Sequence, residues 1–222
     1  ALVSASTLGE GDAGQIMIVA DERMLIDGVS SLTGVASSIS SSVEFTGRGD
    51  GGSIDITTPL LTIDRGGAIF GRTQGDGNAG SISLEVDALD ISNGGQVVTT
   101  SFTGGAAGDI EIVARDYIRL TGRDNTYQDR VASTTFNALG GESSGIYAST
   151  DASSTGSSGS VSIETRQLLL NDTAQLSASS RGTGVAGSLD ITATQVQLNE
   201  STIQAESRNG DRGNINIASP IL

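Results

Sequence analysis

The stretch that decides the fold runs from Gly80 to Ala107 and reads GSISLEVDALDISNGGQVVTTSFTGGAA. At Gly108 the sequence GDIEIVARDYIRLTG begins the same pattern again, 28 residues after Gly80. The pattern is Gly-x-Ile-x-Leu or Ile, a short polar gap, Leu-x-Ile, a turn with Gly or Asn, a third apolar stretch and a Gly-rich return. Self-similarity at a fixed period of this length is the signature of a solenoid, so we interpret this unit as one coil.

Equivalent glycines begin further copies along most of the chain, at spacings of 38, 28, 28, 51, 28 and 26 residues. Within a copy, apolar residues such as Ile110 and Ile112 alternate with polar ones, which is the period of a strand with one buried face. No helical periodicity separates the three apolar stretches. The sequence therefore predicts an all-β fold, a right-handed parallel β-helix with three short strands in each of about seven coils. The starts are Gly14, Gly52, Gly80, Gly108, Gly159, Gly187 and Gly213.

Polar residues follow the second strand of each coil and suit tight corners, because their side chains bond to nearby backbone. Stacked coils should align them in a polar ladder, with Asn171 over Asn199. The same stacking should place Asp87 beside Arg115 of the next coil. The six corner residues are Asp27, Asp64, Ser92, Thr121, Asn171 and Asn199.

Two coils carry insertions between the second and third strands, at about residues 28–37 and 121–144. Because both leave from the same corner, we expect them to project from one edge of the rod. The first residues, 1–6, resemble a third strand, and residues 219–222 resemble the start of a second strand. We therefore expect residues 1–222 to be a single β-helix segment of a longer protein.

The composition excludes several classes of function. The chain has 26 acidic and 12 basic residues, a formal charge of −14, so we expect it to bind neither nucleic acid nor an anionic membrane. It has no Cys and no His, which excludes zinc fingers, disulfides and an imidazole base. No apolar run is long enough for a membrane span.

Two phrases, GNAGSISLEVDALDISNGGQVVTTS at 77–101 and RGNINIASPIL at 212–222, carry a resemblance to a known family. They resemble the repeat region of filamentous-haemagglutinin-like exoproteins of two-partner secretion systems, especially the long cyanobacterial type. The resemblance implies a right-handed β-helix, export through an outer-membrane transporter as partner, and an adhesive or fibrous role outside the cell or at its surface.

Short motifs at the return turns have a structural and a functional interpretation. Arg48-Gly49-Asp50 spells an integrin-type tripeptide, but other coils place Gly-Asp at the same turn, so we favour a corner role. The Gly-Asp turns also resemble calcium-binding β-helix repeats, although the offset of the Asp varies. We expect no cofactor, with a loosely bound Ca²⁺ as the alternative.

Acidic residues point outward from the first strands, and paired carboxylates could cleave a glycosidic bond. These acids alternate between two columns with serines interposed, which is typical of avoided like-charge stacking. We therefore expect no enzyme activity. The residues are Asp55, Glu85, Glu111, Glu164 and Asp190.

The long insertion is the one place where arginines and aromatics gather: Arg123, Tyr127, Arg130 and Phe136. Such side chains could contact a glycan or a cell-surface protein, or the aromatics could pack the loop against the rod. We expect a structural or adhesive rod, with end-to-end self-association into fibres also open. A polysaccharide-binding or polysaccharide-cleaving β-helix is the alternative.

Overall fold

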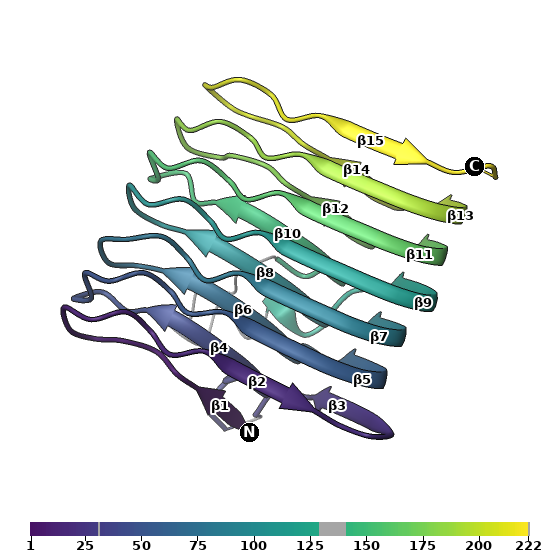
Figure 1. Ribbon diagram of the computed structural model, residues 1–222, viewed down its shortest axis with the longest axis horizontal. Helices are drawn as coiled ribbons and strands as arrows, with labels where there is room; N and C mark the ends of the chain where they lie inside the picture. Colours follow the sequence, from purple (N-terminus) through teal and green to yellow (C-terminus); the bar gives the residue numbers. More distant parts are fainter. Residues whose placement is uncertain (31, 129–140, 222) are drawn as a thin grey trace.

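The computed structural model describes residues 1–30, 32–128 and 141–221. All pairs of named strands in it are parallel, and they form two sheets. Figure 1 shows the strands stacked along the chain, with the N-terminus and C-terminus at opposite ends of the stack. From β3 onward successive strands alternate between the sheets, whereas β2 and β3 both pair with β5, so neighbours in a sheet come from successive repeats of the sequence. This is the architecture of a parallel β-solenoid, as the sequence predicts.

The first sheet, here called sheet A, has seven strands in the order β1-β4-β6-β8-β10-β12-β14. It contains the third apolar stretch of each repeat. The strands are β1 (Leu2–Ser4), β4 (Ser38–Val43), β6 (Ala68–Thr73), β8 (Gln96–Ser101), β10 (Gly145–Thr150), β12 (Gln175–Ser177) and β14 (Thr202–Gln204).

The second sheet, sheet B, has eight strands: seven in the order β15-β13-β11-β9-β7-β5-β2, and β3 beside β5. They are β2 (Ile16–Val19), β3 (Arg23–Asp27), β5 (Ile54–Asp64), β7 (Ile82–Ser92), β9 (Ile110–Thr121), β11 (Val161–Asn171), β13 (Leu189–Asn199) and β15 (Ile215–Ala218).

In the central repeats the structure joins the first and second expected strands into one long strand, so three separate strands per coil is wrong there. In β7, Val86 and Leu89 are both buried while Asp87 and Ala88 both face outward, so the alternation skips one position. The gap residues are extended and include no glycine, and they continue the hydrogen bonding to β9 on either side of the skip. A short gap without a turn residue therefore changes the facing of the strand without ending it.

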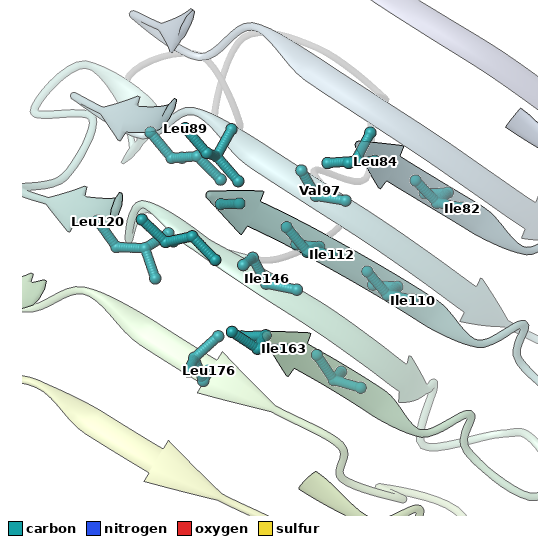
Figure 2. Packing of buried hydrophobic residues seen from close by; sticks show 14 of the residues in the cluster. Ile82, Leu84, Leu89, Val97, Ile110, Ile112, Leu120, Ile146, Ile163 and Leu176 are labelled. Atoms are coloured by element: carbon teal, nitrogen blue, oxygen red, sulfur yellow. The ribbon is translucent and has the colours of Figure 1, made fainter. Parts of the chain in front are cut away.

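The core is a set of aliphatic ladders between the two sheets. Ile110 pairs in register with Ile82 on one side and Val161 on the other, and all three are buried. Sheet A supplies the opposite ladder, in which Val97 pairs with Ile146. Figure 2 shows Ile82, Ile110, Val97 and Ile146 among the side chains that lie between the sheets. The inward positions expected from the alternation are therefore confirmed in the central repeats, whereas Leu198 and Ile215 near the C-terminal end of the stack are 47% and 44% exposed.

The polar corner ladder is also confirmed. Asn171 pairs with Asn199, and Asp27 pairs with Asp64. Asp64 Oδ1 accepts hydrogen bonds from Ser92 Oγ and Asn93 Nδ2, both at 2.8 Å. Burial raises the pKa of Asp64, but the hydrogen bonds from Asn93 and Ser92, with help from Arg65, outweigh it and lower the pKa below its ordinary value. The ladder thus stabilises a charged carboxylate at this corner.

The described parts of both insertions lie between a strand of sheet B and the next strand of sheet A. In the first, Val29 and Ala36 form an antiparallel bridge before β4. In the second, Arg123 and Ser143 form an antiparallel bridge before β10. That the two insertions project from one edge stays a prediction. The described part of the chain has no helix that is long and apolar enough to span a membrane.

Candidate functional site

The predicted contact residues of the long insertion fall into two groups. Arg123 and Tyr127 are described, whereas Arg130 and Phe136 lie outside the described residues. Arg123 Nη1 donates to Glu142 Oε1 at 3.2 Å, across the antiparallel bridge at the base of the insertion. Because this ion pair joins the two arms of the insertion, it gives Arg123 a structural role that needs no ligand.

Tyr127 is partly buried. Tyr147 is only 2% exposed, and its hydroxyl donates to the Ser143 carbonyl oxygen at 3.1 Å. Burial is the main cause that raises the pKa of Tyr147, and the nearby Tyr127 adds to it. The partial burial of Tyr127 favours the packing interpretation over its full display to a ligand.

The outer face of sheet A carries a second apolar cluster, which the sequence analysis did not single out. Phe70, Val98 and Tyr147 pair in register across β6, β8 and β10, and all three are buried. Arg72 lies over the Phe70 ring at 5.3 Å and makes an ion pair with Glu44 at 3.2 Å. The Arg72 guanidinium is held by Glu44 and by the Phe70 ring, although its Nε is buried without a hydrogen-bond partner among the described residues, and we assign the cluster a structural role.

The outer face of sheet B carries a network of charges beside a β-bulge. At the bulge, Arg115 and Asp116 of β9 oppose the single residue Asp87 of β7. The predicted pair is confirmed, since Arg115 Nη1 lies 3.0 Å from Asp87 Oδ1. Asp116 accepts from Arg166 of the next strand at 3.4 Å. Each of these exposed ion pairs joins two adjacent coils and contributes on the order of 0 to 1 kcal/mol to the stability of the fold.

A partly buried carboxylate, Asp90, lies three residues further along β7. Asp90 accepts a hydrogen bond from the Tyr117 hydroxyl at 3.0 Å and lies 2.7 Å from Arg119 Nε. Burial raises the pKa of Tyr117, and the hydrogen bond and charge of Asp90 raise it further. Tyr117 is therefore a neutral hydrogen-bond donor that is already occupied within the protein.

A shallow groove of about 610 Å³ runs along the outer face of sheet B near the bulge. Two of its charged residues, Arg115 and Arg166, are held in the ion pairs described above. Its other lining residues are mainly Thr, Ala and Ser. Glu164 also lines the groove, but none of the lining residues is aromatic, so the groove is not the preferred candidate site.

The return turns of the Gly-Asp type use their side chains to cap the neighbouring coil. Asp12 Oδ1 accepts from the Asp50 backbone N–H at 2.8 Å, and Asp50 Oδ1 accepts from the Asn78 N–H at 2.8 Å. A Cβ on Gly49 would lie 2.5 Å from the Gly11 carbonyl oxygen, so the backbones stack too closely for any side chain there. Gly49 and Asp50 thus have the structural roles expected of a corner. Arg48, the remaining residue of the tripeptide, is exposed and has no such role.

Arg48 lines a pocket of about 320 Å³ at the end of sheet A. Three successive return turns build it, those that follow β4, β6 and β8. Phe45 contributes a ring that is 77% exposed, and Arg48 and Asp76 contribute opposite charges that are both exposed. The lining residues are Phe45, Thr46, Gly47, Arg48, Gln74, Gly75, Asp76 and Thr103.

The polar groups of this pocket are only partly used within the protein. Thr46 Oγ1 donates to the Leu8 carbonyl at 2.7 Å, and Thr103 Oγ1 donates to the Gly75 carbonyl at 2.7 Å. Gln74 Oε1 is buried without a hydrogen-bond partner among the described residues. Within the described chain, neither Arg48 nor Asp76 forms a side-chain hydrogen bond or ion pair. The pocket combines unused donors, unused acceptors and an exposed ring.

Sequence reasoning missed this pocket because its residues come from three repeats. The sequence contained only a weak indication of this pocket. Phe45 is one of four Phe in the chain and lies three residues before Arg48. Among residues 1–30, 32–128 and 141–221, no group of three His, Cys, Asp or Glu could hold a metal ion. Weak Ca²⁺ binding at the turns stays a prediction.

No family model matches the chain. Neither a curated protein nor a solved structure matches it. The resemblance to filamentous-haemagglutinin-like exoproteins therefore stays a prediction from the repeat phrases.

Proposed function

We propose that this chain is a non-enzymatic rod segment of an exported surface protein, built as a right-handed parallel β-helix. Seven or eight strands per sheet, at a spacing of about 4.8 Å, correspond to about seven coils and a length of roughly 30 to 35 Å. The right hand is the hand that parallel crossovers adopt. Such a rod spaces or displays surface loops along a longer molecule.

The observation that supports a mechanical role is the continuous ladder of buried residues that runs from coil to coil. Ile54, Ile82 and Ile110 pair in sequence, and the ladder continues through Val161 to Leu189. Each coil therefore contacts its two neighbours through hydrogen bonds and aliphatic packing, and stability is close to a sum over adjacent coils. A structure of this kind resists bending along its whole length.

The surface chemistry supports a place outside the cell or at its surface. A net charge of −14 keeps a repetitive protein soluble at high local concentration. The family resemblance supports an adhesive role, with an outer-membrane transporter as export partner and end-to-end self-association between copies as the route to a fibre.

The outward acids support a non-enzymatic role. Asp55 pairs with Ser83, Ser83 with Glu111, and Glu111 with Ser162. The serines separate the carboxylates along this column, which limits like-charge repulsion and is typical of a structural surface. Polysaccharide cleavage is therefore the weaker alternative.

Electron microscopy of the purified native protein tests the proposal, with a reducing-sugar assay on the same sample. We expect straight rods with strands repeating along their axis, either single or joined end to end, and no release of reducing ends. Compact particles without an axial repeat, or steady release of reducing ends from a polysaccharide, would contradict a purely mechanical role.

A further inference from the structure

The pocket between the return turns after β4, β6 and β8 has a composition that points to one class of ligand. The guanidinium of Arg48 only donates hydrogen bonds, whereas the carboxylate of Asp76 and Gln74 Oε1 only accept them. Arg48 and Asp76 both line the pocket but make no ion pair with each other. Their charges cancel formally, so the pocket suits a neutral ligand that can both donate and accept.

The exposed ring of Phe45 adds an apolar surface to these polar groups. A side chain that is 77% exposed gains little from folding, because it remains in contact with water. Pockets that bind small molecules combine an apolar or aromatic wall with a few fixed polar groups that set orientation. A sugar ring matches this arrangement, since it has a face of C–H groups and a rim of hydroxyls that donate and accept.

We propose that this pocket binds a sugar unit of an uncharged glycan, with Phe45 against the ring face and the exposed Arg48 and Asp76 on the hydroxyls. The volume of about 320 Å³ lies at the lower end of the range of roughly 300 to 1,000 Å³ for small-molecule sites. Three stacked turns at about 4.8 Å span roughly 10 Å, which fits one or two sugar rings of a longer chain.

The net charge of the protein disfavours the binding of anionic glycans. A net charge of −14 repels a polyanion such as a polyuronate, and the pocket offers only Arg48 to counter it. A fully apolar ligand would leave the Asp76 carboxylate without a hydrogen-bond donor. The proposal is independent of the rod function, because the pocket depends only on three adjacent turns.

Saturation-transfer NMR and titration calorimetry on the whole chain test the proposal. The probes are neutral hexasaccharides of glucose, mannose and xylose, with hexagalacturonate as the anionic comparison. We expect saturable binding of at least one neutral probe and no binding of hexagalacturonate. The Phe45→Ala and Asp76→Asn variants should each bind that probe about tenfold more weakly or worse.

The matched control is Arg166→Gln, which removes an exposed arginine from the groove on sheet B and should bind like the wild type. Circular dichroism should show an unchanged fold in all variants, because Phe45 and Asp76 are exposed. If Phe45→Ala unfolds, Arg48→Gln replaces it in the comparison. The proposal is overturned if no neutral probe binds, if hexagalacturonate binds more tightly, or if the pocket variants bind as well as the control.

Discussion

Replacing Ile110 by Asp tests the inward and outward assignment of the repeat most directly. Ile110 is 1% exposed and lies between Ile82 and Val161 in the central ladder. Removing a buried aliphatic side chain alone costs about 2 to 5 kcal/mol. The carboxylate adds the cost of placing a charge or an unpaired polar group among aliphatic side chains. Together these costs approach the 5 to 15 kcal/mol by which a typical domain is stable.

The neighbouring residue Glu111 provides the control, because it is exposed and pairs with serines on both sides. Glu111→Ala should change the free energy of unfolding by about 0.5 kcal/mol or less. Ile110→Ala is a third variant that removes volume without adding charge, and should lower the urea midpoint by about 1 M. The chain has no Trp, so far-UV circular dichroism monitors unfolding.

We expect Ile110→Asp to unfold without a cooperative transition, or with a urea midpoint well below that of Ile110→Ala. The unfolding curve of Glu111→Ala should coincide with that of the wild type. Equal midpoints for Ile110→Asp and Glu111→Ala would refute the assignment. A larger loss for Glu111→Ala would show that the two faces of β9 are exchanged.

Two further predictions concern the turns and the corner ladder. A Cβ on Gly159 would lie 2.0 Å from the Gly108 carbonyl oxygen, whereas Gly9 has no atom within 4 Å; thermal melts should therefore show a large loss of stability for Gly159→Ala and almost none for Gly9→Ala. Asp64→Ala should lower the free energy of unfolding at pH 7 by about 1 to 3 kcal/mol, because Asn93 and its other donors lose their acceptor. The folded-state pKa of Asp64 is lowered, so this stabilisation is present above the ordinary value of 3.8 and is lost as pH falls through the folded pKa. Urea titrations at pH 7 and pH 3 should thus show a smaller difference between wild type and Asp64→Ala at the lower pH, and an equal or larger one would contradict the assigned hydrogen bonds.

The sequence by itself determined the parallel stacking, the inward residues and the register between coils. In a solenoid each residue lies beside its equivalent one period away, so the spacing of Gly80 and Gly108 already contains the long-range contacts. For the same reason the pairs Asn171 with Asn199 and Asp87 with Arg115 could be predicted from alignment alone.

Only the tertiary structure decided the features that depend on backbone path or on several coils at once. The continuity of β7 through Asp87 and Ala88 depends on hydrogen bonds to its neighbours, which a local pattern of alternation does not contain. The burial of Tyr147 on the outer face of sheet A depends on what packs over that face, and outward positions look alike in the sequence. The pocket at Phe45 and Arg48 exists because stacked turns bring side chains from three repeats together, and those side chains are not repeated from coil to coil. Periodicity thus predicts what every coil shares, whereas the candidate site is built from the residues in which the coils differ.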